Sequence, residues 1–299
     1  MKTEIRGCRP EELPAVIEGI DQEFITSKHR VLSLAQRFPG TLCRENTPRI
    51  LVAISEAAIC GALSIKPFEW AAPERNWHGA MIGMVWVDAQ YRGTGIGGRL
   101  LSSATHFLYD SGVDFGVLWT GTPGFYERAG WRLNDSGLFG VAANHAGCTS
   151  GADVSCQPLV SVDVAWLENL RSRYLPKRVV RNAADYRTVP IPATRVLCFS
   201  AMNPDGSGGY ALVGEEDGVG YLYEMVAPPA LWDRIWGAVG ERFARVYVNG
   251  QVDDPFSEWL AERDFVVWEP QHKTMWLSVN GSIGESDFDA WHIPYFDWI

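Results

Sequence analysis

Between Met84 and Leu101, an apolar strand, a glycine-rich turn and a helix follow one another directly, and few folds accommodate that succession. The segment reads MVWVDAQYRGTGIGGRLL, with glycines at 93, 95, 97 and 98 where the helix opens. Glycines let backbone N–H groups approach a ligand closely, and the unpaired N–H groups and dipole of a helix start attract anions. The segment therefore predicts a phosphate or pyrophosphate site; the alternative is that the glycines only mark a turn.

Two classes of ligand compete for this turn. Gly93, Gly95 and Gly98 match the G-x-G-x-x-G fingerprint of dinucleotide-binding folds. That fingerprint follows its strand almost directly, and an acidic residue ends the next strand about 20 residues later. Here residues 88–92 intervene, and the next predicted strand ends at 118–120 without a carboxylate. The spacing therefore argues against a dinucleotide.

The segments on either side of the turn predict a mixed α and β domain. A helix is expected over 10–25, a second helix follows the glycines as far as Gly112, and PGFYERAGW (123–131) predicts a short helix with a glycine near its end. Short apolar runs predict strands at 50–54, 60–65, 81–87 and 115–120.

The second half of the chain repeats this order, which predicts an internal duplication. A Gly-, Ser-, Ala- and Thr-rich stretch at 148–156 is the expected linker, and the expected domains are 1–147 and 160–299. The predicted elements of the second domain are strands at 195–200, 210–214, 219–226 and 245–248, helices at 228–243 and 256–265, and a closing hairpin of 266–268 with 275–279.

Composition narrows the class of partner. The 299 residues carry a net charge of −10, most of it in the second half. Excess carboxylates repel nucleic-acid phosphates and favour a cationic amine, although acidity also serves solubility. The longest apolar run is far shorter than the ~20 residues of a membrane span, and the charged start lacks a signal-peptide pattern, so a cytoplasmic protein is expected. No C-x-x-C or H-x-x-x-H pair occurs, so no metal is expected.

Two motifs resemble those of the GNAT acyltransferase superfamily. Arg92, Gly95 and Gly97 form R-x-x-G-x-G after the strand residues VWV, which is similar to the superfamily's acetyl-CoA motif, and GFYERAGW (124–131) resembles its second signature. The two motifs cover about 81–131, and the resemblance in the order of elements extends over about 1–145. It implies the GNAT fold, an α/β fold on a mixed sheet.

Within the superfamily, the chain resembles the tandem-domain Eis-like acetyltransferases. RFPGTLCREN (37–46) is similar to their segment before the first strand pair, and LWTGTPGFY (118–126) to their strand-to-helix turn. With 299 residues, no sterol-carrier-like domain of the kind that those proteins have is expected. The second half has VAPPALW (226–232) where the first has its glycine turn, so we expect a degenerate GNAT-like domain that cannot hold phosphate in that way.

The resemblance implies acetyl-CoA as cosubstrate, without a metal or a covalent enzyme intermediate. Main-chain groups of Val85, Trp86 and Val87 would pair with the pantetheine arm, beside a splay between this strand and the strand at 115–120. The residues expected around the pyrophosphate are Arg92, Gly93, Thr94, Gly95, Ile96, Gly97 and Gly98. Four aromatic residues of the second domain are expected to wall the pocket of a cationic amine: Tyr221, Tyr223, Trp232 and Trp236.

Tyr126 is the predicted general acid, because a phenol with a pKa of about 10 is protonated at neutral pH and can protonate the departing thiolate. A core tyrosine is the alternative. No base stands out: four groups flank the expected acceptor groove, but each is more typical of a solvated surface group, and a water relay would also serve. They are Glu23, Glu69, Glu74 and His78.

The C-terminal segment, FDAWHIPYFDWI (288–299), is unusually aromatic and is expected to dock on folded surface. It either covers the second domain, or crosses to the first domain and brings Asp297 or the terminal carboxylate to the amine as the base.

The sequence thus predicts an N-acetyltransferase that joins acetyl-CoA and a small, cationic primary amine in a ternary complex. A catalytically silent acyl-CoA-binding regulatory module is the alternative. The identity of the amine and the oligomeric state stay open.

Overall fold

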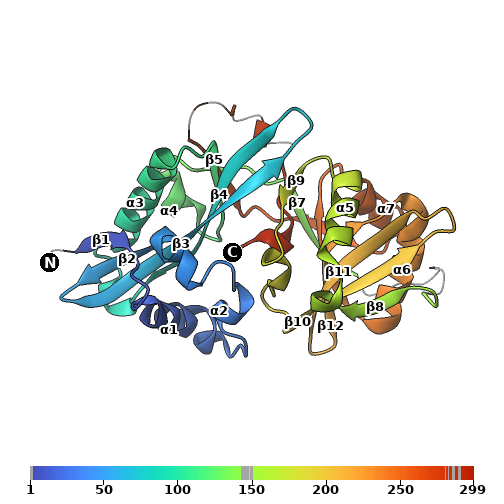
Figure 1. The fold of residues 1–299 in the computed structure, drawn as a ribbon, viewed down its shortest axis with the longest axis horizontal. Coiled ribbons are helices and arrows are strands. Elements are labelled where there is room, and N and C mark those ends of the chain that lie inside the picture. Colours follow the sequence, from blue (N-terminus) through green and yellow to red (C-terminus); the bar gives the residue numbers. More distant parts are fainter. Residues whose placement is uncertain are drawn as a thin grey trace.

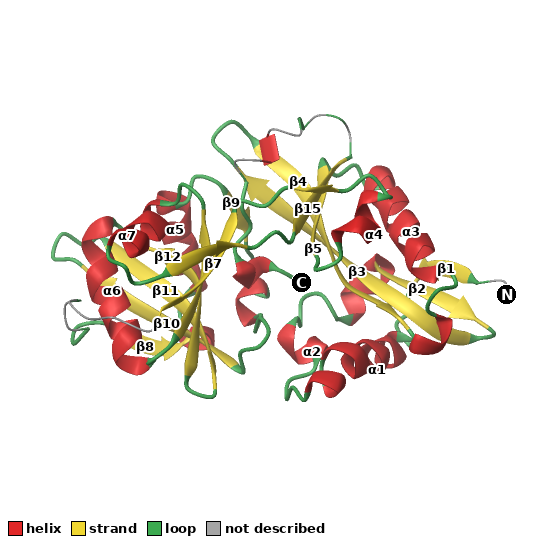
Figure 2. Cartoon of the chain, turned by 180° about the vertical axis from the view of Figure 1, so that it is seen from behind, coloured by secondary structure: helices red, strands yellow, loops and turns green. Residues whose placement is uncertain are grey.

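The computed structural model describes residues 3–142, 148, 151–279, 281, 283, 284, 287, 288 and 291–299. Two α/β halves lie side by side, each built on one sheet, which confirms the mixed α/β class expected from the sequence (Figures 1 and 2). Within these residues, no helix is long and apolar enough to cross a membrane.

The first sheet has the strand order β1-β2-β3-β4-β5-β15-β6, and β9 pairs with β3. The four strands predicted in the first half are confirmed as β2 to β5, but β3 and β4 extend into a long hairpin that reaches toward the second half (Figure 1). The bounds are β1 Glu4–Gly7, β2 Ile50–Ser55, β3 Ala58–Ala71, β4 Asn76–Val87, β5 Phe115–Trp119, β6 Arg132–Leu133, β9 Arg178–Val180 and β15 Thr274–Ser278.

Helices cover both faces of this sheet (Figure 2). On one face, α1 (Leu13–Phe24) and α2 (Leu34–Arg37) bury a stripe that includes Val16 and Ile20. On the other face, α3 (Ile96–Asp110) buries Leu100, Ala104 and Leu108, and α4 (Pro123–Glu127) packs beside it. The helices predicted from these apolar stripes are therefore confirmed.

The second sheet has the order β14-β7-β13-β12-β11-β10-β8. The strand bounds are β7 Gly137–Ala142, β8 Ser155–Pro158, β10 Arg195–Met202, β11 Gly208–Glu216, β12 Val219–Val226, β13 Val246–Gln251 and β14 Val267–Pro270. One face packs against α6 (Pro229–Arg242) and α7 (Pro255–Glu262), and the other against α5 (Val164–Tyr174). Both sheets contain a parallel pair, β4 with β5 and β12 with β13, beside a strand with a shifted register, which supports the inferred duplication.

The two halves exchange strands. β7 pairs with β13 and β14 in the second sheet, whereas β15 pairs with β5 and β6 in the first sheet. The closing hairpin expected from 266–268 and 275–279 is therefore wrong. β15 is apolar on both faces, with Met275 on one side and Trp276 on the other, and such a strand is buried inside a sheet rather than at its edge. The domain limits at 147 and 160 stay a prediction; the sheets do not divide there, and 143–147, 149 and 150 lie outside the described residues.

Candidate functional site

The parallel strands β4 and β5 diverge at their C-terminal ends. They pair from Gly79 with Phe115 to Met81 with Val117, and the described residues beyond Met81 form no further pairs between them. At the same level the register of β4 against β3 shifts, and Met84 adopts a φ of +54°. A bulge of this kind bends a strand and turns its N–H and C=O groups out of the ladder. The splay expected beside Val85, Trp86 and Val87 is therefore present.

The glycine turn places the N-terminus of α3 beside this splay. Gly95 is the N-cap residue of α3 and adopts a φ of +85°, a region that L side chains rarely occupy. Apart from the neighbouring residues and backbone of the same turn and helix, no atom of the described residues lies within 4 Å of an added Cβ at Gly93, Gly95 or Gly98. The turn is therefore open to a ligand, as an anion site on a 15-residue helix requires.

Arg92 is held away from the turn. Its Nε donates to the carbonyl of Val87 at 3.0 Å, and its Nη2 pairs with Glu23 Oε2 at 2.6 Å. Both side chains of the pair are about half exposed, and exposed pairs contribute little, so Arg92 can exchange Glu23 for a phosphate. Its role at the pyrophosphate stays a prediction.

Tyr126 lies on α4 and faces the splayed strands. Its side chain is 9% exposed and packs edge-on against Phe125. Burial raises the pKa of Tyr126 above its usual value of 10, and a hydrogen bond with Thr120 opposes this shift only in part. The phenol is thus protonated throughout the neutral range and can donate a proton.

A cavity of about 560 Å³ lies between the splayed end of β4 and Tyr126, and no residue of the glycine turn lines it. Its lining comes from α1 and α2, the bulge of β4, the turn after β5, Tyr126, the segment at 190–191, Lys273 and the C-terminal residues: Phe24, Leu34, Phe38, Ile82, Gly83, Met84, Val85, Trp119, Thr120, Gly121, Thr122, Tyr126, Pro190, Ile191, Lys273, Tyr295, Trp298 and Ile299. The four candidate bases, Glu23, Glu69, Glu74 and His78, are not among them.

The C-terminal segment crosses between the halves, as one of the two expectations held. Trp291 packs against Trp70, Trp77 and Phe115 of the first half, with ring centroids 5.0–5.6 Å apart. Further along, Phe296 is buried among residues of the second half. Figures 1 and 2 show the end of the chain between the two halves.

Asp297 is not at the reacting centre. It is 3% exposed, and both its oxygens accept hydrogen bonds from Arg181, at 2.6 and 2.8 Å, while Arg181 also binds Glu224. Burial opposes ionisation, but the charge and hydrogen bonds of Arg181 lower the pKa of Asp297 overall. The expectation that Asp297 serves as a base is therefore wrong; it anchors the segment.

This anchor brings Ile299 to the bulge of β4. A Cβ added at Gly83 would lie only 2.5 Å from the main-chain oxygen of Ile299, so the two backbones are in direct contact. The main-chain carbonyl group of Ile299 thus lies beside β4, and Ile299 lines the same cavity as Tyr126.

The second half contributes less to the cavity than expected. Trp236 is fully buried and Trp232 packs beside it in the core under α6, so neither walls an acceptor pocket. Tyr221 and Tyr223 do line an adjoining cavity of about 340 Å³. The turn before α6 has Pro228 as its N-cap and lacks the glycines of the first half, in agreement with the expected degeneracy.

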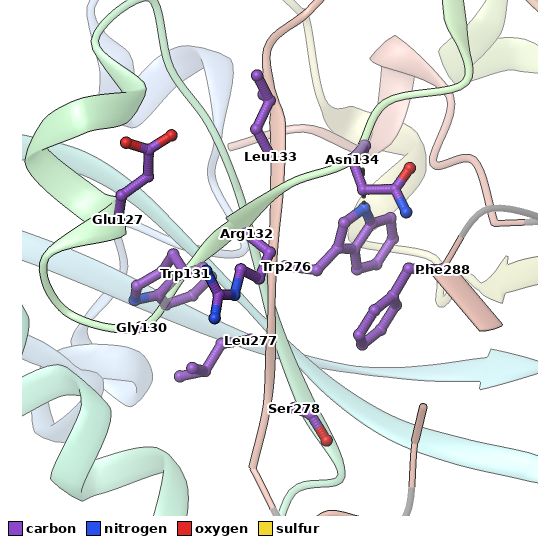
Figure 3. Close-up of a pocket in the computed structure, with 10 residues that line it drawn as sticks. All are labelled: Glu127, Gly130, Trp131, Arg132, Leu133, Asn134, Trp276, Leu277, Ser278 and Phe288. Atoms are coloured by element: carbon purple, nitrogen blue, oxygen red, sulfur yellow. Dashed lines mark hydrogen bonds between the residues drawn. The ribbon is translucent and has the colours of Figure 1, made fainter. Parts of the chain in front are cut away.

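A larger cavity, of about 770 Å³, lies along β6 and β15 (Figure 3). Its lining includes Glu127, Arg132 and Trp276, and it shares no lining residue with the cavity at Tyr126. Neither the strand splay nor the glycine turn borders it, so its size alone does not mark the functional site. Among the described residues, no group of three or more His, Cys, Asp or Glu side chains could hold a metal ion.

The sequence did not single out Trp119, Lys273, Tyr295 or Trp298, which line the Tyr126 cavity. A smaller cavity next to Gly98 also includes His106 and Arg128, two basic residues at the α3–α4 surface. The aromatic excess of the C-terminal segment was the one signal for Tyr295 and Trp298. Nothing local marks Lys273, because strand exchange brings it to the cavity.

Replacement of Gly95 by Val is expected to raise the dissociation constant for acetyl-CoA at least about 100-fold, because the branched side chain opposes the positive φ and fills the open turn. Calorimetry measures the affinity. Gly112→Val is the matched control, since Gly112 also has a positive φ and open surroundings but ends α3. Unchanged affinity in the Gly95 variant, with the fold intact, contradicts the assignment of the turn.

Comparison with known proteins agrees with this geometry. Residues 4–134 match the model of a family described as an acetyltransferase (GNAT) domain. The fold is similar to that of a GCN5-related N-acetyltransferase from Anabaena variabilis, with a TM-score of 0.71, 14% identity, and coverage of 94% of this chain and 74% of the other. For Eis1 from Mycobacterium abscessus the TM-score is 0.65 and the identity 14%, and the match covers 94% of this chain and 74% of the other. For a tandem GNAT protein from the clavulanic acid biosynthesis pathway the TM-score is 0.57 and the identity 12%, and the match covers 94% of this chain and 100% of the other. No curated protein sequence matches the chain.

Proposed function

We propose that the protein transfers the acetyl group of acetyl-CoA to a primary amine, because residues 4–134 match the model of a GNAT acetyltransferase domain and the fold is similar to that of a tandem GNAT protein. The observation that carries the proposal is the meeting of three features at one place: the splay between β4 and β5, the open N-terminus of α3, and a buried phenol at the end of the splay.

The chain supplies a binding surface for the cosubstrate. The unpaired edge of β4 after Met81 offers N–H and C=O groups to the pantetheine amides, and the turn at Gly93–Gly98 offers N–H groups to the pyrophosphate. An N–H at the bulge would also hold the thioester oxygen and stabilise the negative charge that develops during attack. This arrangement favours direct transfer within a ternary complex.

Two proton transfers complete the reaction. The amine loses a proton, its nitrogen attacks the thioester carbon, the carbon–sulfur bond breaks, and Tyr126 protonates the thiolate as it leaves. The carboxylate of Ile299 is the proposed acceptor of the amine proton, because it lies against β4 in the same cavity. This role requires that the mature chain ends at Ile299, which the mass of the intact protein decides.

The test is release of free thiol from acetyl-CoA in the presence of a panel of primary amines, with mass spectrometry of the acetylated products. Release that depends on both the amine and Tyr126 supports transfer. Tight binding of acetyl-CoA without release for any amine in the panel favours the silent binding module instead.

A further inference from the structure

We propose that the acceptor is a primary amine with a planar apolar body and no second cationic group, and that Lys273 excludes diamines and polyamines. This inference rests on the proposed acetyl transfer and concerns the acceptor side of the same site.

The acceptor side consists of two adjoining cavities. The cavity at Tyr126 and the adjoining cavity of about 340 Å³ share four lining residues: Ile191, Lys273, Tyr295 and Trp298. Together the two cavities, called the groove below, extend from the proposed reacting end, at Tyr126 and Ile299, past Lys273, to Tyr221 on the second sheet. An amine that reacts at the inner end must extend its body along this path.

Flat aromatic faces line that path. Trp119 stacks on Trp298 with ring centroids 4.7 Å apart, and the ring centroid of Tyr295 lies 4.6 Å from that of Trp298. Further out, Tyr221 stacks on Tyr247 at 5.2 Å. Stacking covers the sides that face each other, so the rings line the cavities with their remaining faces and edges, which suit a planar apolar body better than a flexible polar one.

The charges in the groove oppose a second cation. Apart from the proposed carboxylate of Ile299 at the reacting end, no described acidic group lines the inner cavity, and Glu269 is the one described acid in the outer cavity. The other described acids of the acidic second half lie elsewhere, so the negative net charge is not concentrated at the acceptor. Lys273 borders both cavities, so a second ammonium group on the body of an acceptor would be forced close to a like charge.

The backbone of Lys273 is well fixed. Its N–H donates to Asp135 at 2.7 Å, and its carbonyl accepts a hydrogen bond from the N–H of Thr120 at 2.9 Å. Its ammonium makes no ion pair with any described residue. The backbone of Lys273 is therefore fixed at the junction of the two cavities, and its side chain is exposed there.

Three amines separate the two parts of this inference: hexylamine, 1,6-diaminohexane and 2-phenylethylamine. The first two differ in one ammonium group, and the first and third in the planar body. In steady-state assays with acetyl-CoA, we expect kcat/KM for hexylamine to exceed that for the diamine by about 10-fold or more. We expect 2-phenylethylamine to exceed hexylamine by roughly 10-fold.

Lys273→Glu is expected to abolish or reverse the preference for hexylamine over the diamine, with KM for acetyl-CoA unchanged. Lys177→Glu, an exposed site outside both cavities, is the control for the change in net charge. Tyr221→Leu should reduce the preference for 2-phenylethylamine, whereas Tyr109→Leu on exposed α3 surface should not.

The possible results distinguish a failure of the proposed acceptor class from a failure of the proposed acetyl transfer. Acetylation of the diamine as fast as hexylamine, or a preference for the diamine that Glu269→Gln removes, overturns the proposed acceptor class and leaves acetyl transfer standing. An unchanged amine preference in Lys273→Glu overturns the role of Lys273. Absence of thiol release with every amine overturns acetyl transfer itself, and the acceptor class with it.

Discussion

Replacement of Tyr126 by Phe is expected to lower kcat by about 10- to 1,000-fold while the affinity for acetyl-CoA stays nearly unchanged, because the variant loses only the proton donor for the departing thiolate. The buried ring keeps its packing against Phe125, so the fold should survive. Single-turnover rates and calorimetry measure the two quantities. Tyr109→Phe on exposed surface is the control.

The pH profile gives a second readout of the same residue. Burial raises the pKa of Tyr126 above 10, so the acid form persists as the pH rises through 9. Wild-type kcat should therefore show no falling limb below pH 9. Full kcat in the Phe variant would return Tyr126 to the role of a core residue.

Removal of Trp298 and Ile299 is expected to lower kcat/KM for the amine at least about 100-fold, because it takes away both the proposed proton acceptor and one wall of the groove. The affinity for acetyl-CoA should hold, since the glycine turn lies elsewhere. Deletion of all of 288–299 is a poorer test, because it also removes buried Phe288, Trp291 and Phe296 and leaves Arg181 buried without Asp297.

Two milder variants isolate the carboxylate of Ile299. Gly83→Ala displaces it, because the new Cβ would meet the Ile299 backbone, whereas Ile299→Val keeps the carboxylate and changes only the side chain. We expect loss of kcat/KM for the amine in the first and near-normal activity in the second. Thermal unfolding and acetyl-CoA affinity check that Gly83→Ala is folded. Full activity of folded Gly83→Ala, or of the chain without its last two residues, contradicts the proposed role.

Features that depend on short stretches of chain could be predicted from the sequence. The glycine turn, the helix that follows it and the strands on either side are local patterns: positive φ at Gly95 and the stripe of Leu100, Ala104 and Leu108 need no distant partner to be recognised. Local motifs also led to Tyr126, and the aromatic C-terminal segment showed that those residues must be covered.

Only the tertiary structure decided which distant residues contact these local elements. The amino acids of β15 predict a strand but not the sheet that it joins, because any open strand edge with apolar faces could pair with it. In the structure it pairs with β5. Glu23 looks equally free in the sequence whether or not Arg92 is near, and Asp297 could have been a base had Arg181 not enclosed it. The sequence by itself determined the local elements of the proposed cosubstrate site, which are one strand, one turn and one helix. The proposed acceptor groove was decided by long-range packing, because Gly83, Tyr126, Lys273 and Ile299 come together only after the halves have exchanged strands and the C-terminal segment has crossed between them.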